Sequence, residues 1–242
     1  MALKCVLFDL GETLVTREVE GRAVDMVALD RLVTFANRSG YRMDRESSIS
    51  LFLKNYRRLD ELRDSFLVEI PMRCWLDNLL SHISSRRIDE RLLRRAIDIF
   101  VEARSSGVVC FPEVPNVLGC LLKSKYRLGI VTNTSSSEVP NRVLSQLKLR
   151  GYFNVVATSA ELGVRKPYPG IFHYALRELS ARVEDTAFVG DSVKHDIIGA
   201  KSLGMKTVLV DRRRHNRKTL QADVTLRSLS RLPKVLANLQ VQ

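Results

Sequence analysis

A short apolar run near the start of the chain ends at a carboxylate. Cys5 to Phe8 are apolar, Asp9 follows them directly, and Gly11 comes two residues later, where the chain must turn. An apolar run of this length that ends at a turn is typical of a buried strand. A carboxylate just beyond the carboxyl end of a parallel strand lies where open α/β sheets bind their ligands. Asp9 is therefore a candidate functional residue, and the alternative is that it caps a turn or a helix.

Polar side chains follow a second apolar run. Leu128 to Val131 is followed by Thr132 and Asn133. Their side chains, together with backbone N–H groups at the end of a strand, can donate hydrogen bonds to phosphate oxygens. Further along, Lys166 precedes Pro167 at the start of a predicted helix, and a lysine there can supply a point charge to a phosphate. The alternatives are an ordinary turn and a solvated surface lysine.

Two carboxylates follow a third apolar run. Ala187 to Gly190 is followed by Asp191, and Asp196 comes five residues after Asp191. Mg²⁺ takes a few carboxylates and keeps several waters, so a sparse set of acidic residues is enough to hold it. Asp191 is therefore the best candidate for a Mg²⁺ ligand. The alternative is that both residues cap the following helix.

The candidate residues of these runs and of the lysine segment occur in a definite order along the chain. They are, in sequence, Asp9, Thr132, Asn133, Lys166, Asp191 and Asp196. This order and spacing resembles the four motifs of the haloacid dehalogenase superfamily, most of whose members are phosphohydrolases. The resemblance covers the chain from Lys4 to about Leu236.

The resemblance implies a role for each matching position. Asp9 would be the nucleophile, since a carboxylate can attack phosphorus and form an aspartyl-phosphate. Lys166 would neutralise the charge of the phosphate and of Asp9, as a catalytic and phosphate-binding residue. Thr132 and Asn133 would bind the phosphate oxygens.

The resemblance also implies a metal site. Asp191, Asp9 and the backbone carbonyl of Gly11 would be the ligands of Mg²⁺. Thr13 would orient the first loop, and Asp196 would lie behind the ligands or bind the ion through water. The expected cofactor is therefore Mg²⁺.

The first motif departs from the pattern of the superfamily's phosphatases. Those enzymes carry Asp-x-Asp-x-Thr, and the second Asp is their general acid and base. This chain has Gly11 at that position, within Asp9-Leu10-Gly11-Glu12-Thr13. The departure puts ordinary phosphomonoesterase chemistry in doubt. Glu12 is the nearest carboxylate, but it is adjacent in sequence, so its side chain should leave the backbone in another direction.

The segment after the first motif differs from the rest of the chain because its apolar residues recur at helical spacing. Four helices are expected, over 23–37, from 44 or 45 to 63, from Pro71, and after Asp89 as a cap. Helices of this size form a bundle. By the resemblance, residues 15–106 are a helical type 1 cap domain that closes over the active site.

The remainder alternates between strand and helix signals. Strands are expected at Gly129–Thr132, Val155–Thr158, Ala187–Val189 and Thr207–Val210, with helices at Glu138–Leu147, Pro169–Leu179 and Asp196–Leu203. Such alternation indicates βαβ units and a parallel sheet with helices on both faces. The predicted fold is α/β: a Rossmann-like, doubly wound core formed by residues 1–14 and 107–242, with an inserted helical domain.

Composition limits the partners. The chain has 242 residues, with 39 Lys and Arg against 27 Asp and Glu. This excess favours anionic ligands. Nucleic acid is not expected, because the densest basic run, Arg212 to Lys218, contains no aromatic residue to stack on bases. No run approaches the roughly 20 apolar residues that span a bilayer, and Asp9 comes too early for a secretory signal. We therefore expect a cytoplasmic protein and no membrane partner; the oligomeric state stays open.

Three functions remain compatible with the sequence. The first is a Mg²⁺-dependent phosphohydrolase that acts on a small phosphorylated or anionic substrate, with activity weakened or restricted by Gly11. The second is a module that binds a phosphate compound without turnover. The third is a metal-independent haloacid dehalogenase, which also lacks the second Asp. That branch typically replaces the metal-binding acid with Ser or Asn, so Asp191 argues for phosphate chemistry.

Overall fold

The computed structural model describes residues 3–84, 87–212 and 221–239. Of the basic run Arg212 to Lys218, only Arg212 lies within these ranges. Across the three ranges, the model contains no helix with the length and apolar character needed to cross a membrane.

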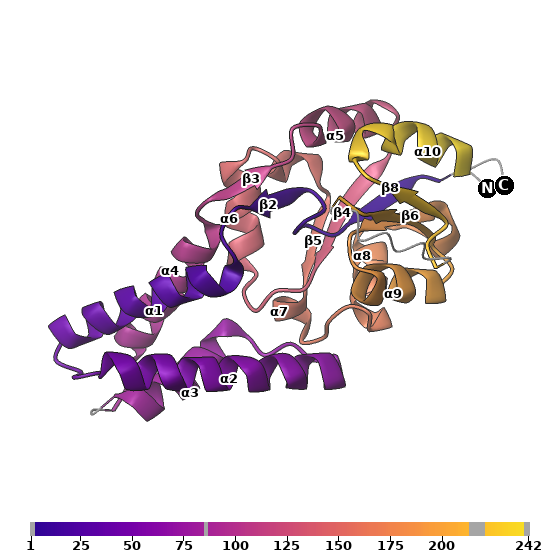
Figure 1. The fold of residues 1–242 in the computed structure, drawn as a ribbon. Helices are drawn as coiled ribbons and strands as arrows, with labels where there is room; N and C mark the ends of the chain where they lie inside the picture. The colour runs from indigo at the N-terminus through magenta and orange to yellow at the C-terminus, as the bar shows by residue number, and fades with distance from the viewer. Residues whose placement is uncertain (1–2, 85–86, 213–220, 240–242) are drawn as a thin grey trace.

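A six-stranded parallel sheet forms the centre of the molecule (Figure 1). Its strands are β1 (Cys5–Phe8), β4 (Arg127–Thr132), β5 (Val155–Thr158), β6 (Thr186–Gly190), β7 (Lys206–Val210) and β8 (Val224–Leu226). Their order is β5-β4-β1-β6-β7-β8. The chain winds outward from β1 in one direction through β4 and β5, then crosses to β6 and continues the other way. The strand order therefore reverses at β1, which is where such sheets bind ligands.

Helices cover both faces of the sheet because successive side chains of a strand point to opposite sides. Val6 and Phe8 pack with one set of helices, and Cys5 and Leu7 pack with the other. The first set is α5 (Val114–Lys123), α6 (Glu138–Gln146) and α10 (Leu232–Leu239). The second set is α8 (Pro169–Glu178) and α9 (Ile198–Ser202), with the short α7 (Ser159–Leu162) nearby. The predicted α/β class is confirmed.

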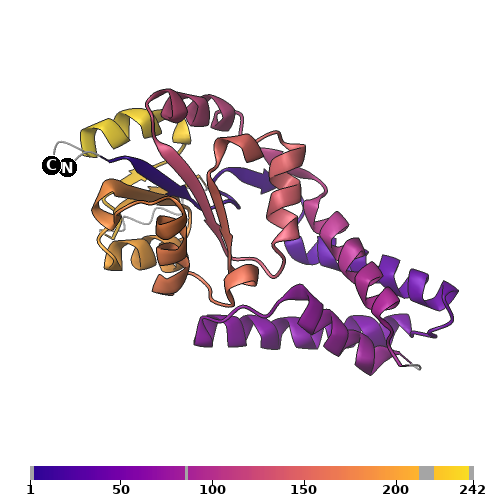
Figure 2. The ribbon, with the colours of Figure 1, turned by 180° about the vertical axis from the view of Figure 1, so that it is seen from behind.

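Four helices between β1 and the rest of the sheet project to one side of it (Figures 1 and 2). They are α1 (Gly21–Arg38), α2 (Arg45–Phe66), α3 (Met72–Ile83) and α4 (Glu90–Ser105), and together we call them the helical insert. Asp44 and Asp89 cap α2 and α4 through their carboxylates. The insert has an apolar cluster of its own, in which the rings of Phe52, Trp75 and Phe100 pack edge to face or tilted against one another.

A two-stranded antiparallel ribbon connects the insert to the sheet. It consists of β2 (Val15–Arg17) and β3 (Val108–Cys110), with Val15 opposite Cys110. Gly107, just before β3, has a φ of +66°, a conformation that side chains disfavour. The chain thus enters and leaves the insert at one place. The proposed boundary at residue 15 falls at the start of this ribbon, and the division into two domains stays a prediction.

The last motif differs in detail from its expected helix. A π-helical turn, η3 (Val193–Ile197), precedes α9, whereas the predicted helix begins at Asp196. The physical reason is Ser192: its carbonyl accepts from Asp196 N and Ile197 N, and its hydroxyl accepts from His195 N. Turns of this kind are frequent at functional sites.

Candidate active site

The carboxyl ends of three neighbouring strands bring the predicted residues together. Asp9 follows β1, Thr132 ends β4 and Asp191 follows β6. Phe8 lies opposite Ile130 of β4 and Val189 of β6, so the three strands end at almost the same level. Asp9 N also donates to Val189 O at 2.9 Å, which continues the strand pairing up to the carboxylate.

Lys166 lies between two carboxylates. Its Nζ is 2.7 Å from Asp9 Oδ1 and 2.6 Å from Asp196 Oδ1, and the residue is 2% exposed. Burial alone lowers the pKa of Lys166, but the charges of Asp196 and Asp9 outweigh it, and the pKa is raised above its ordinary value. The ammonium group therefore stays charged, and it holds the two carboxylates on either side of it.

A third carboxylate completes this group, which we call the carboxylate cluster: Asp9, Asp191, Asp196 and Lys166. One oxygen from each aspartate lies within 4.8 Å of the others. Burial, above all, raises the pKa of Asp9 to about 6 against the attraction of Lys166. Burial and the charges of Asp9 and Asp196 raise the pKa of Asp191 to about 7. Three carboxylates share one ammonium group, and a divalent cation with oxygen ligands would relieve this excess negative charge.

The side chain of Asn133 holds the main chain of Lys166 through two hydrogen bonds. Its Oδ1 accepts from Lys166 N at 2.8 Å, and its Nδ2 donates to Lys166 O at 3.1 Å. The side chain predicted to bind phosphate therefore also fixes the segment that carries the lysine. Thr132, at the end of β4, is 7% exposed.

Gly11 faces open space. It lies outside the positive-φ region, and a Cβ built there meets no heavy atom of the described chain within 4 Å. Neither backbone strain nor crowding therefore explains the glycine. Glu12 has a φ of 55°, and its Oε1 accepts from Thr16 Oγ1 at 3.0 Å.

A cavity of about 240 Å³ opens beside these residues. Its lining includes Gly11, Glu12 and Arg17 as well as Thr132 and Asn133. The cavity therefore adjoins both the first loop and the predicted phosphate-binding residues, where the rest of a substrate would lie.

Thr13 is held by its backbone rather than by its hydroxyl. Its carbonyl accepts from Arg212 Nη2 at 3.0 Å, and Arg212 also pairs with Glu113 at 2.7 Å. Within the part of the chain that the structure describes, the buried Thr13 Oγ1 has no hydrogen-bond partner. Arg212 was not singled out from the sequence as an anchor of the first loop, since nothing local links it to Thr13.

The helical insert reaches the loops of the site at several points. Asp64, near the end of α2, lies 2.8 Å from Lys194 Nζ and 3.7 Å from His195 Nε2 in the fourth motif. Met72 N donates to Ser135 O at 2.6 Å, just after the second motif. The insert therefore lies against the carboxyl edge of the sheet.

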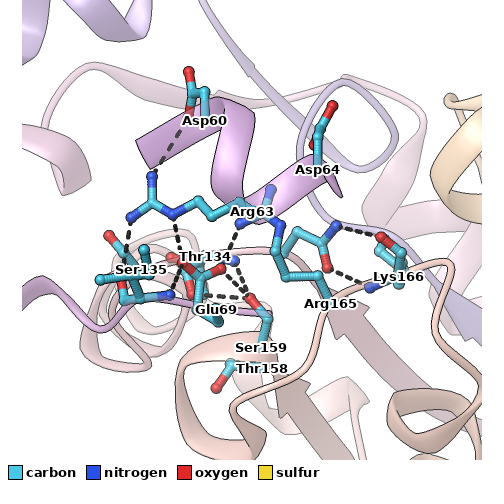
Figure 3. Close-up of polar contacts among 12 residues, drawn as sticks. Asp60, Arg63, Asp64, Glu69, Thr134, Ser135, Thr158, Ser159, Arg165 and Lys166 are labelled. Atoms are coloured by element: carbon cyan, nitrogen blue, oxygen red, sulfur yellow. Dashed lines mark hydrogen bonds and ion pairs between the residues drawn. The ribbon is translucent and has the colours of Figure 1, made fainter. Parts of the chain in front are cut away.

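A second buried ion cluster lies in this contact (Figure 3). Glu69 joins Arg63 of the same insert to Arg165 and Ser159 of the sheet side, and we call these four residues the Glu69 cluster. The sequence contains one signal for it: Glu69 is the acidic residue in an otherwise apolar segment, Leu67 to Ile70, which Pro71 follows.

Comparison with known proteins adds the family. Residues 49–210 match the sequence profile of the protein family described as haloacid dehalogenase-like hydrolase. Glyceraldehyde 3-phosphate phosphatase from Pyrococcus furiosus is 30% identical to the chain, over 85% of the chain and 80% of that protein.

Two solved structures span nearly the whole chain. A 2-haloacid dehalogenase from Pseudomonas syringae pv. Tomato DC3000 is 28% identical, with a TM-score of 0.75, and the match covers 98% of this chain and 99% of that one. A HAD phosphatase from Thermococcus onnurineus is 27% identical, with a TM-score of 0.65, covering 97% and 98%. The resemblance read from the motifs is thereby confirmed, and the chain belongs to the haloacid dehalogenase-like hydrolase family of enzymes.

Proposed function

We propose that this protein is a Mg²⁺-dependent phosphohydrolase that acts on a small sugar phosphate through an aspartyl-phosphate. The observation that carries the proposal is the carboxylate cluster, in which Lys166 lies between Asp9 and Asp196 while Asp191 remains exposed beside them. Three carboxylates face one ammonium group, so the ionised cluster carries more negative charge than Lys166 balances, and burial together with the neighbouring carboxylates raises the pKa values of Asp9 and Asp191.

Asp9 performs the first step. With a pKa of about 6, its carboxylate is mostly ionised above neutral pH. One of its oxygens attacks phosphorus, a new O–P bond forms, and the bond between phosphorus and the leaving oxygen breaks. In the second step water attacks the phosphorus of the aspartyl-phosphate, which releases phosphate and restores the Asp9 carboxylate. Lys166 holds Asp9 in place and offsets the charge of the phosphate during both steps.

The carboxylates would hold the metal ion. Asp191 and Asp9, with the Gly11 carbonyl, are the proposed ligands, and Asp196 holds Lys166 behind them. When bound, Mg²⁺ supplies positive charge to the phosphate oxygens and so reduces the repulsion between two anions. Thr132 and Asn133 would donate hydrogen bonds to those oxygens at the end of β4.

Gly11 restricts the leaving group. A general acid is worth about 10²–10⁴ in rate when the leaving group is a poor one. With glycine at this position, an alkoxide takes its proton from water or from Glu12, the nearest carboxylate of the first loop. We therefore expect aryl and acyl phosphates to react faster than alkyl phosphates.

The cavity beside the site favours small substrates. Its volume of about 240 Å³ suits a leaving group of a few carbon atoms. The named phosphatase relative acts on glyceraldehyde 3-phosphate, which supports a triose phosphate or a similar compound as substrate. In this proposal residues 15–106 form the cap, which closes the cavity from the side of the helical insert.

A haloacid dehalogenase remains the second candidate, because the solved dehalogenase matches the chain over almost its full length. In that case Asp9 would attack carbon and no metal would be needed. Asp191 beside Asp9 and Asp196 argues against it, since a third carboxylate would only repel an anionic haloacid.

One assay separates the three functions. Release of product is measured from p-nitrophenyl phosphate, glyceraldehyde 3-phosphate and chloroacetate, each with Mg²⁺ and with EDTA. The proposal requires phosphate release that EDTA abolishes. Chloride release that persists in EDTA would show a dehalogenase. Binding of inorganic phosphate with no turnover of any substrate would show a binding module.

A further inference from the structure

We propose that Glu69 is a positioning residue, through which the helical insert fixes the arrangement of Lys166 and Asn133 that binds phosphate. The inference rests on the proposed function, because it concerns how that site is ordered. Glu69 itself belongs to the segment between α2 and α3 and contacts neither Asp9 nor Asp191 in any described interaction.

The Glu69 carboxylate is completely buried and has partners on both sides of the contact. Its side chain is 0% exposed. Arg63 Nε lies 3.0 Å from Oε1, Arg165 Nη1 contacts Oε2, and Ser159 Oγ lies 2.7 Å from Oε2. Figure 3 shows these groups converging on the carboxylate from α2, from the start of α7 and from the segment between α7 and α8. A carboxylate is buried at this depth only when such partners compensate the loss of water.

One connection runs from Glu69 to Lys166. Arg165, which binds the carboxylate, is the residue directly before Lys166. Two backbone hydrogen bonds fix the same segment to the insert: Arg165 N donates to Leu67 O and Glu69 N donates to Gly163 O, both at 2.9 Å. The segment that positions Lys166 beside Asp9 is therefore attached to the insert through the side chain of Arg165 and through its main chain.

A second connection runs from Glu69 to Asn133. Ser159 Oγ contacts Glu69 and accepts a hydrogen bond from Thr134 N at 2.7 Å. Thr134 follows Asn133, whose amide binds both the N–H and the C=O of Lys166. The two connections thus meet at the same pair of residues, Asn133 and Lys166, which are the proposed phosphate-binding groups.

The charges explain why the carboxylate itself is needed. Arg63 and Arg165 both contact Glu69, and Arg63 has Asp60 as a second partner at 3.4 Å. Without the negative charge of Glu69, two guanidinium groups would be left close together in a buried place, where they repel. Arg165 would move away, and Lys166 would move with it.

The test compares Glu69→Gln with Glu90→Gln in the full-length protein. Glu90 pairs with Arg73 at 2.6 Å and with Arg94 at 2.9 Å on the exposed surface of the insert. Its substitution therefore also removes a carboxylate that lies between two arginines, but at a site far more exposed than that of Glu69. For each protein we would measure kcat/KM for p-nitrophenyl phosphate, the inhibition constant of inorganic phosphate, and the affinity for Mg²⁺ by calorimetry.

The expected result is selective. Because a displacement of about 1 Å costs on the order of 10²-fold in rate, Glu69→Gln should lower kcat/KM by about 10²-fold. It should also weaken inhibition by phosphate much more than it weakens Mg²⁺ binding, since Asp191 lies outside the two connections and Asp9 is reached only through Lys166. Glu90→Gln should behave as wild type. Phosphate affinity is the readout that a purely structural anchor between insert and sheet would not change.

Ser159→Ala provides a second variant in case Glu69→Gln does not fold. It removes the hydrogen bonds of Ser159 Oγ to Glu69 and Thr134 but leaves the ion pairs of Glu69. We therefore expect a smaller loss of phosphate inhibition than in Glu69→Gln, with the Mg²⁺ affinity retained. Wild-type phosphate affinity in either folded variant, or parallel loss of Mg²⁺ affinity, would overturn the positioning role. If the wild-type protein neither binds nor releases phosphate, the proposed function itself fails, and the role of Glu69 fails with it.

Discussion

The carboxylate cluster and the Glu69 cluster have opposite charge patterns. In the carboxylate cluster one ammonium group, on Lys166, lies between the carboxylates of Asp9 and Asp196. In the Glu69 cluster one carboxylate lies between the guanidinium groups of Arg63 and Arg165. Both lie at the carboxyl edge of the sheet, and they are linked because Arg165 and Lys166 are consecutive residues.

The difference between them indicates what each is for. The Glu69 carboxylate has the serine hydroxyl and a backbone N–H as further partners, so its needs are met within the chain. In the carboxylate cluster three carboxylates face one ammonium group, and partial burial together with the charges of Asp9 and Asp196 raises the pKa of Asp191 to about 7. A satisfied cluster stabilises a contact, whereas an unsatisfied one is suited to bind a cation and react.

The largest expected effect comes from adding a carboxylate beside the unsatisfied cluster. Gly11→Asp should raise kcat/KM for alkyl phosphates by about 10²–10⁴-fold, because it supplies the missing general acid. The open space and ordinary φ at Gly11 allow the side chain. The measurement is the ratio of kcat/KM for aryl over alkyl phosphates, which should fall.

Gly119→Asp is the matched control, since a Cβ at this position of α5 also meets open space. It should leave the aryl to alkyl ratio unchanged. If wild type already cleaves alkyl phosphates as fast as aryl ones, another acid is present, and Glu12 is the first residue to replace.

Removing a carboxylate from the same cluster is the second prediction. Asp191→Asn should lower Mg²⁺ affinity and reduce kcat/KM by about 10²–10³-fold, the cost of removing one group that stabilises developing charge. Asp98→Asn, at an exposed position of α4, is the matched control and should change neither. Equal hydrolysis by wild type and Asp191→Asn at limiting Mg²⁺ would exclude Asp191 as a ligand.

The third prediction concerns pH. The folded protein holds protons on Asp9 and Asp191 up to pKa values of about 6 and 7, while an unfolded aspartate releases its proton near 3.8. Between about pH 4 and 7 the folded state therefore binds more protons, so the metal-free protein loses stability as pH rises through this window.

Mg²⁺ should reverse that trend, because it replaces the protons. The increase in Tm on adding Mg²⁺ is expected to be large at pH 7.5 and small at pH 5, measured by differential scanning calorimetry. In Asp191→Asn the metal-free protein should lose less stability over the same pH range. A Mg²⁺ effect of equal size at both pH values would contradict the assignment of the cluster.

The smallest effect is expected at Arg17, which lines the cavity. Its guanidinium donates to Arg104 O, and no described carboxylate lies within ion-pair distance of it. Arg17→Ala should reduce kcat/KM by about tenfold for substrates with a second anionic group, as for the loss of one charged hydrogen bond. Substrates without such a group should be unaffected. Arg38→Ala, at the exposed end of α1, is the control.

The sequence predicted the strands and the site better than it predicted the contacts between distant segments. Strands such as Val155–Thr158 are short apolar runs with clear ends, so their limits follow from local signals. The proximity of Asp9 and Asp191 could be predicted because the carboxyl ends of parallel strands lie at the same edge of a sheet. The bond from Arg212 to Thr13 joins residues far apart in the chain, and no local pattern encodes it. The same holds for the pairing of Glu69 with Arg165.

The position of β1 has a consequence for folding. It is the first strand of the chain and lies in the middle of the sheet, yet both strands that pair with it come much later in the sequence. Cys5 of β1 lies opposite Arg127 of β4 and Thr186 of β6. During synthesis at about 5–20 residues per second, this apolar strand waits several seconds for its first partner, while the helical insert can already form from local contacts. An unpaired apolar strand is prone to aggregate, so the nascent chain should be most vulnerable in the interval between completion of the insert and the emergence of β4.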